Sequence, residues 1–386
     1  YITSSDQLKT FCKSLHSSDV LAVDTEFVRE RTYFHRIGLI QVGGKEGFAA
    51  IDPIILDDLS PLLELLKDPK KIKVFHAARQ DLEILVRLCG QVIPPVFDTQ
   101  VAAALVGWGA QISFAKLIQK ALGKHIHKSE TYTDWCRRPL SENQIKYAID
   151  DVRYLLPAYE KLLERLIQLK RTDWVAGEVN NWEDPATFAL PDPQTRFLKI
   201  KSLRSLSRRN LAVLRELAAW REKVAIARDC LAKSIVRDET LLEIARKMPK
   251  DIKELSGLRG FHHKEANKSG DAILKAVKKG KEVPEVDLPK LADTDGHSTT
   301  RGIEELLSAF VQIRSEELKI EPSILADRKR IRCFATHFEQ KVNMDKNFLL
   351  QGWRKKCIGE PMLKLLNGEV GLKINPSGQI ALIPIE

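Results

Sequence analysis

A short apolar run that leads into two acids constrains the fold of this chain more than any other feature. The stretch from Val20 to Phe27 reads Val-Leu-Ala-Val-Asp-Thr-Glu-Phe. A continuous apolar run is typical of a central strand that is covered on both faces. Asp24 and Glu26 lie two residues apart, so on an extended backbone their side chains project from the same face.

Two neighbouring carboxylates at the end of a buried strand repel each other, and each is hard to ionise in a low-dielectric site. We therefore expect a compensating cation, and a divalent metal ion is the simplest one. The pair alone is equally compatible with a second interpretation, in which one acid caps the next helix and the other is solvated.

Length and composition exclude several classes of protein. At 386 residues and 44% apolar content, the chain is expected to form two or three domains with ample cores. It contains no run of about 18 apolar residues and no secretory signal at its start, so we expect neither a membrane span nor export. The six cysteines form no Cys-x-x-Cys pair. This pattern argues against a zinc site or a disulfide framework and indicates the reducing cytoplasm.

The positive charge of the chain is confined to its middle. Residues 1–190 contain 24 Lys and Arg against 25 Asp and Glu, residues 191–280 contain 22 against 11, and residues 281–386 contain 16 against 16. The middle segment therefore predicts a polyanion-binding module beside near-neutral ones. Its basic side chains, which we interpret as phosphate contacts rather than a solvated face, are Arg208, Arg209, Lys247, Lys250, Lys264, Lys268, Lys275, Lys278 and Lys279.

The order of predicted elements divides the chain into three folded parts. Three strands come first and helices then alternate with strands, which predicts an α/β domain with a mixed sheet flanked by helices. Two blocks of helical periodicity follow, the second with a tail that is short and extended. The predicted bounds are 1–182 for the α/β domain, 183–202 for a linker, 203–282 for the first helical domain, 283–300 for a second linker and 301–386 for the last domain.

The two helical blocks contain similar segments, which suggests a duplicated domain. Ser234–Asp238 and Ser323–Asp327 match at an offset of 89 residues. Chance similarity between two helical stretches is the alternative.

Three more residues complete a possible metal centre. Asp81 lies at the start of a helix that follows a buried strand, and Tyr147 and Asp151 lie at i and i+4 on one helix face. Each is commonplace alone. Together with the first pair, four carboxylates can hold two hard divalent ions. Two such ions about 4 Å apart can clamp a phosphodiester, and a tyrosine beside them can orient the attacking water.

Three segments of the chain resemble the exonuclease motifs of the DEDD superfamily. They are Asp24-Thr-Glu-Phe27, the run from His76 to Leu85 and the run from Tyr147 to Pro157. The stretch from Asp24 to Val42 is similar to the ribonuclease D family, and the resemblance continues as two HRDC-type helical domains, of which the second departs most from the family pattern. Lys128–Trp135 also resembles the family's segment before the third motif.

This resemblance implies a ribonuclease H-like fold and a 3′→5′ exoribonuclease that releases nucleoside 5′-monophosphates with two Mg²⁺ or Mn²⁺ ions. Asp24, Glu26, Asp81 and Asp151 would hold the metal ions, and Glu26 would also lie near the terminal ribose. Tyr147 would orient the water. One subclass of the family has a histidine five residues before the last aspartate, and this chain has Lys146 at that position. The resemblance therefore indicates the tyrosine subclass.

The remaining candidates have less definite roles. Thr25 and Phe27 would contact the substrate, although a core position is at least as compatible with Phe27. We interpret Asp98 as a helix cap, Asp150 as a solvated neighbour and His76 as a core residue.

The family resemblance implies RNA as the partner, with trimming of tRNA precursors as the task, in a cytoplasmic protein that we expect to be monomeric. A single-strand DNA 3′→5′ exonuclease would use the same acids, and contacts to the 2′-OH would tell the two apart. A non-catalytic RNA-binding module is the other alternative. It has no need of clustered acids near a polyanion.

Overall fold

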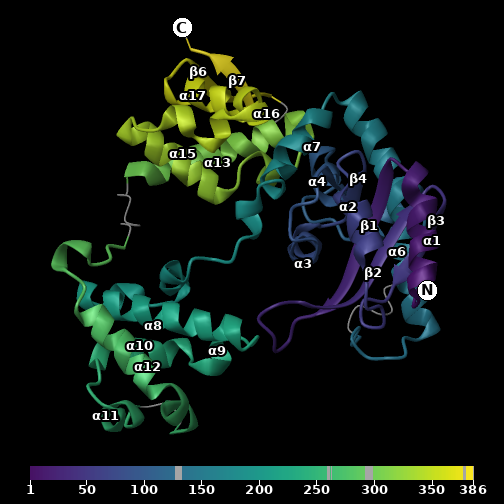
Figure 1. The fold of residues 1–386 in the computed structure, drawn as a ribbon. Helices are drawn as coiled ribbons and strands as arrows, with labels where there is room; N and C mark the ends of the chain where they lie inside the picture. The colour runs from purple at the N-terminus through teal and green to yellow at the C-terminus, as the bar shows by residue number, and fades with distance from the viewer. Residues whose placement is uncertain (127–132, 259–260, 262, 292–298, 377–379, 386) are drawn as a thin grey trace. The chain divides into compact units, whose positions relative to one another are not determined.

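The computed structural model describes residues 1–126, 133–258, 261, 263–291, 299–376 and 380–385. The chain forms two compact units (Figure 1). The first comprises residues 1–26, 37–188 and 295–386, and the second comprises residues 27–36 and 189–294. Among the described residues, no helix is both long and apolar enough to span a membrane.

A five-stranded mixed sheet forms the centre of the first unit. Its strands are β1 (Val20–Val28), β2 (Arg36–Gly44), β3 (Gly47–Ile51), β4 (Ile72–Phe75) and β5 (Val96–Asp98). The order across the sheet is β3-β2-β1-β4-β5, in which β4 runs parallel to both β1 and β5 while β2 and β3 form an antiparallel hairpin. The apolar strand that ends in the acids is therefore central, as its sequence predicts.

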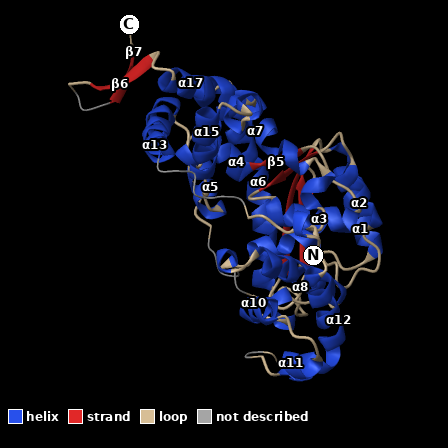
Figure 2. Ribbon diagram, turned by 90° about the vertical axis from the view of Figure 1, so that its left-hand side faces the viewer, coloured by secondary structure: helices blue, strands red, loops and turns tan. Residues whose placement is uncertain are grey.

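Helices cover both faces of this sheet. One layer consists of α1 (Ser5–Ser14), α2 (Ser60–Lys67) and α3 (Arg79–Cys89), and the other of α4 (Thr99–Leu105), α5 (Phe114–Leu122) and α6 (Glu142–Gln168). Figure 2 shows the strands between these two layers. Leu21 and Val23 belong to the apolar core on the first side and Ala22 to the core on the second, because successive side chains of a strand alternate between faces.

Prolines and glycines shape three local features of the first unit. β5 directly follows two prolines. The turn between β2 and β3 is Lys45-Glu46, whereas Gly43 and Gly44 lie within β2; a Cβ on Gly43 would stand 2.2 Å from the ring of Phe48, so a side chain there would force that ring to move. α2 begins at Ser60, with a proline in its first turn, where the missing N–H costs no hydrogen bond.

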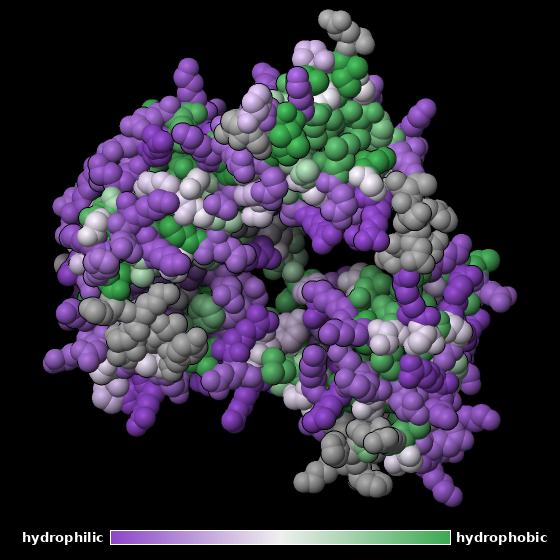
Figure 3. Space-filling model, turned by 180° about the vertical axis from the view of Figure 1, so that it is seen from behind, coloured by the Kyte–Doolittle hydropathy of each residue, from purple (hydrophilic) through white to green (hydrophobic). Residues whose placement is uncertain are grey.

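The C-terminal part of the first unit is a helical domain that ends in a hairpin. Its elements are α13 (Thr299–Leu318), α14 (Pro322–Leu325), α15 (Arg328–Gln340), α16 (Gly352–Arg354), α17 (Glu360–Leu366), β6 (Val370–Ile374) and β7 (Ile380–Pro384). The predicted extended tail is this antiparallel hairpin. Phe310, Phe334 and Met362 are fully buried in its core. Figure 3 shows apolar surface on this part of the chain. Ile374 and Ile380 of the hairpin are exposed.

This helical domain packs against α7 (Thr172–Val179), the helix that follows α6. The rings of Trp174 and Trp353 stack with centroids 4.4 Å apart and an angle of 8°. The guanidinium of Arg354 is 4% exposed and forms an ion pair with both carboxylate oxygens of Glu178. A stacked ring pair beside a buried ion pair fixes the domain on α7, which explains why the two belong to one compact unit.

The second unit is helical. It contains α8 (Arg208–Ala227), α9 (Ala232–Ile235), α10 (Asp238–Lys247), α11 (Ile252–Ser256) and α12 (His263–Lys281). Leu214, Leu217 and Ile273 lie in its core. Residues 27–36 belong to this unit, because the Tyr33 hydroxyl donates a hydrogen bond to Glu222 and the Phe34 amide donates one to Asp229.

Candidate metal centre and nuclease site

Three carboxylates from two elements meet at the end of β1. Asp24 and Glu26 lie on β1 and Asp151 lies on α6, and one carboxylate oxygen of each lies within 4.8 Å of those of the other two. These carboxylates come together because side chains alternate along a strand. Asp24 and Glu26 therefore project from the same face of β1 as Ala22, and α6 covers that face. The sequence spacing thus becomes a cluster that could hold a metal ion.

Asp81 reaches the same place from the opposite layer. It lies in the first turn of α3 and is 7% exposed. Thr25 stands between the two β1 acids and projects to the other face, where its Oγ1 donates a hydrogen bond of 2.5 Å to Oδ1 of Asp81. The charge of Asp24 also acts on Asp81. The fourth predicted carboxylate is therefore beside the cluster, held there by Thr25.

A strained turn between β4 and α3 positions the start of α3, and with it Asp81, beside the carboxylate cluster. Ala77, between β4 and α3, has a left-handed φ of 61°, a conformation that costs a non-glycine residue free energy. The buried carboxylate of Asp98 offsets this cost by accepting hydrogen bonds from the amides of Ala77 and Ala78. It also caps α4 by accepting a 2.7 Å hydrogen bond from Gln100. Asp98 is thus the predicted helix cap, and it also fixes the turn that positions Asp81.

Tyr147 lies one helical turn before Asp151. Its hydroxyl donates a hydrogen bond to the Asp151 carboxylate, which by itself lowers the pKa of that group. The Trp135 ring packs beside the Tyr147 ring, with centroids 6.1 Å apart and planes tilted by 35°. The predicted pairing of the tyrosine and the acid is therefore present, and Trp135 supports it.

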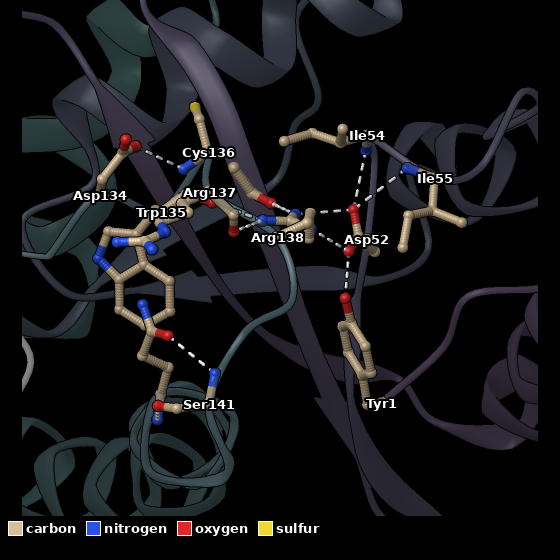
Figure 4. Close-up of polar contacts among 12 residues, drawn as sticks. Tyr1, Asp52, Ile54, Ile55, Asp134, Trp135, Cys136, Arg137, Arg138 and Ser141 are labelled. Carbon is tan, nitrogen blue, oxygen red and sulfur yellow. Dashed lines mark hydrogen bonds and ion pairs between the residues drawn. The ribbon is translucent and has the colours of Figure 1, made fainter.

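A buried ion pair fixes the segment that leads into α6 (Figure 4). The Arg138 guanidinium donates to both carboxylate oxygens of Asp52, at 2.6 and 2.7 Å, and to the carbonyls of Trp135 and Gly38. Burial alone would raise the pKa of Asp52, but the hydrogen bonds from Arg138 and Tyr1 lower it below its usual value. The pair ties this segment to the end of β3.

The same segment lies directly on the sheet at Gly38. A Cβ at this position would stand 2.5 Å from the Trp135 carbonyl oxygen, so the close approach requires glycine. Sequence reasoning did not identify Arg138, Asp52 or Gly38, and it included Trp135 only as the last residue of a segment that resembles the family. Their only signal is an Asp and an Arg in otherwise ordinary segments, 86 positions apart.

All four carboxylates resist ionisation. Burial raises the pKa of Asp24 well above its usual value, and the charge of Asp151 raises it further. Burial and then the charge of Asp24 also raise the pKa of Asp81 and that of Glu26, the latter to about 10. Burial, followed by the charge of Asp150, raises the pKa of Asp151 to about 7. A site of this kind is stabilised by added positive charge, and hard oxygen donors favour Mg²⁺ or Mn²⁺ over softer ions.

A hollow of about 530 Å³ opens beside Tyr147 and Asp151. α6 contributes Lys146, Asp150 and Arg153 to its lining, and α5 contributes Phe114. Cationic and aromatic side chains therefore adjoin the acids, where a nucleotide chain would need them.

Three other candidates have definite places. Asp150 is half-buried and pairs with Arg153 at 3.2 Å. His76 is half-buried and contacts Thr99 and the carbonyl of Ile112 through its two ring nitrogens. Phe27 packs edge-on against His35.

Two segments that the sequence singled out fall partly outside the described residues. They are the segment from Lys128 to Trp135, of which residues 133–135 are described, and the side chain of Lys264.

Comparisons with known proteins identify the family of the chain. Residues 1–167 match the model of the 3′-5′ exonuclease family, and residues 210–277 match that of the HRDC domain. The chain is 38% identical to ribonuclease D of Granulibacter bethesdensis over 99% of this chain and 96% of the relative. The chain belongs to the ribonuclease D family. It is 36% identical to ribonuclease D of Cronobacter turicensis over 95% of this chain and 99% of that one.

The solved structure of Escherichia coli RNase D superposes with a TM-score of 0.84 at 33% identity, covering 95% of this chain and 98% of that one. This ribonuclease D is therefore a 3′→5′ exoribonuclease with an α/β exonuclease domain followed by a helical HRDC region. The predicted family, fold class and enzyme class are confirmed, and a purely binding role is excluded.

Proposed function

We propose that this ribonuclease D holds two divalent ions, Mg²⁺ or Mn²⁺, with Asp24, Glu26, Asp81 and Asp151, and that Tyr147 orients the attacking water. The observation that carries the proposal is the convergence of four carboxylates with raised pKa values from β1, α3 and α6. A cluster with this self-repulsion costs stability unless cations offset it.

Bound ions of this kind supply a hydroxide nucleophile at neutral pH and stabilise the charge on the leaving oxygen. The chain's own groups place the reactants. The Tyr147 hydroxyl donates a hydrogen bond to the Asp151 carboxylate, so its oxygen lone pairs remain to accept a hydrogen bond from water. This arrangement orients the water without removing the Tyr147 proton.

Glu26 gives the site its polarity. Its carboxylate can accept a hydrogen bond from the free 3′-hydroxyl of a terminal ribose, which only the 3′ end of an RNA provides. Thr25 would act on the site through its hydrogen bond to Asp81, and Phe27 would stack on the last base. A substrate with a 3′-phosphate would bring negative charge against Glu26 and resist cleavage.

We also propose structured RNAs, tRNA precursors among them, as substrates in the cytoplasm, and a monomeric enzyme. The Escherichia coli match is described as an exoribonuclease involved in structured RNA processing. The net charge of +11 in residues 191–280 suits duplex and backbone binding. Within the bounds predicted above, residues 1–182 would cleave, residues 203–282 would capture RNA, and residues 301–386 would brace the cleaving domain through α7.

Digestion of matched RNA and DNA oligonucleotides with Mg²⁺ or excess EDTA tests the proposal. We expect RNA to be shortened from its 3′ end, EDTA to stop the reaction, and Asp81→Asn to abolish most turnover while RNA binding persists. The matched control is Asp6→Asn on the exposed surface of α1. Undiminished turnover of Asp81→Asn, or full activity in EDTA, would contradict the metal site, and faster cleavage of DNA would identify a DNA exonuclease.

A further inference from the structure

The α5 helix is basic within a domain that is otherwise near neutral. No Asp or Glu occurs between Asp98 and Glu130. Lys116 and Lys120 lie on successive turns of α5, and Lys124 follows the C-cap residue Gly123; all three lysines are exposed. Because residues three and four apart share one face of a helix, Lys116 and Lys120 form one basic ridge.

A second hollow, of about 720 Å³, lies along this ridge. Its lining combines an aromatic ring, cations and neutral polar groups, and contains no acid: Trp108, Gly109, Gln111, Ile112, Ser113, Lys116, Gln119 and Lys120. The ammonium of Lys120 lies 5.7 Å from the centroid of the Trp108 ring. Stacking aromatics beside backbone-neutralising cations are what single-stranded nucleic acids require.

The loop that carries Trp108 is held in place. The carbonyl oxygen of Ile112, at the end of this loop, accepts hydrogen bonds of 3.1 Å from the His76 ring and from the Gln100 side chain. Gly107, at its start, has a left-handed φ of 78°, and a Cβ there would stand 2.5 Å from the Lys319 carbonyl oxygen. Trp108 is therefore presented from an anchored loop, which reduces the conformational entropy lost on binding.

Consecutive residues at the start of α5 line the second hollow and the one beside the acids. Ser113 lines the outer hollow and Phe114 the inner one, so the first turn of α5 separates them. Phe114 packs near His76, with ring centroids 5.5 Å apart. A strand whose 3′ end lies at Asp24 and Asp151 can therefore continue across this turn and reach Trp108.

We propose that Trp108, Lys116 and Lys120 bind the single-stranded RNA segment immediately 5′ of the nucleotides in the active-site hollow. A base stacks on Trp108, and the two lysines contact the adjoining phosphates; Lys120 moves from the ring to a phosphate as the base arrives. This inference rests on the proposed function of the acidic cluster. It gives the exonuclease domain a hold on its substrate that is independent of the HRDC region.

The length dependence of cleavage in the full chain tests this site. KM and kcat are measured for 5′-labelled oligoadenylates from two to about twelve nucleotides with Mg²⁺. For the longer substrates, Trp108→Ala is expected to raise KM about tenfold, within the range for loss of one stacked base. Lys116→Gln/Lys120→Gln should make the slope of log affinity against log salt less steep by about 1.4, at about 0.7 for each phosphate contact.

The dinucleotide is the internal control, because it does not reach Trp108. Its KM and kcat should be unchanged in both variants, and Trp108→Phe should restore most of the affinity for long substrates. Lys9→Gln/Lys13→Gln is the matched charge control, because those lysines line a different hollow together with Glu64 and Asp68.

Two results would overturn the inference. One is a KM for long substrates that is the same in Trp108→Ala and in Lys116→Gln/Lys120→Gln as in the control Lys9→Gln/Lys13→Gln. The other is an equal rise for the dinucleotide and the long substrates, which would indicate general damage. Failure of the proposed function is distinguishable, because then the wild-type enzyme would not shorten RNA, or Asp81→Asn would shorten it at the wild-type rate.

Discussion

Replacing Asp151 with Asn should stabilise the metal-free enzyme, and the gain should depend on pH. The native environment raises the pKa of this carboxyl from an ordinary value of 3.8 to about 7, first through burial and then through the charge of Asp150. At about 1.4 kcal/mol for each pH unit, this rise corresponds to about 4 kcal/mol of unfolding free energy. Asn has nearly the same size and no charge, so it removes this cost.

The sign follows from proton binding. Between pH 4 and about 7 the native state holds a proton on Asp151 that the unfolded chain has released. The unfolding free energy of the wild type therefore falls as pH rises through this window and stays low above it. The difference between Asp151→Asn and the wild type should be near zero at pH 4 and should reach about 2–4 kcal/mol in favour of the variant at pH 8.

Urea unfolding in EDTA, followed by circular dichroism at both pH values, measures this difference. Glu160→Gln, an exposed change on the same helix, is the matched control and should give no difference. Adding Mg²⁺ at pH 8 should reverse the order, because a bound ligand stabilises the form that binds it. A variant that is less stable than the wild type at pH 8 in EDTA would refute the reasoning, because the carboxylate would then be stabilising without a cation.

Three further predictions concern residues around the cluster. Tyr147→Phe should lower kcat roughly 10²-fold under single-turnover conditions with little change in KM, the low end for a positioned proton-handling group; an unchanged kcat would leave Tyr147 with a packing role. Arg138→Met should cost about 3 kcal/mol in urea unfolding, because it leaves Asp52 buried without its partner, and Asp52→Asn in the same chain should recover part of that loss. Trp353→Ala should destabilise the first unit by about 3 kcal/mol through the lost stack, and a midpoint equal to the wild type would show that the contact on α7 is weak.

The sequence predicted the parts of the site that follow local rules. Alternation along β1 put Asp24 and Glu26 on one face, and helical periodicity put Tyr147 and Asp151 on another. Both rules relate residues that are only a few positions apart in the sequence. The order of the motifs along the chain came instead from the family resemblance. The convergence of β1 with α6 needed only the expectation that a central strand is covered on both faces.

The supports of the site depend on contacts between distant segments, which no local pattern contains. Arg138 meets Asp52 across 86 positions, and Thr25 meets Asp81 across 56. For the same reason, the sequence indicated only one of the two roles of Asp98. Its capping of α4 is a local contact, whereas its hydrogen bond with the Ala77 amide joins distant segments. The charge count over residues 1–190 also averaged out the acid-free stretch after Asp98, so it did not single out the lysines of α5.

The central claim is that the acidic cluster cleaves RNA from its 3′ end, and the fate of a 5′-labelled RNA tests it most directly. The wild type and Asp24→Asn are each incubated with the RNA and Mg²⁺, and the labelled fragments and released nucleotides are analysed. The account predicts a ladder of shortened labelled products and free nucleoside 5′-monophosphates with the wild type, and intact, still bound RNA with Asp24→Asn. A wild-type ladder from Asp24→Asn, or internal cleavage of a circular RNA of the same sequence, would contradict it.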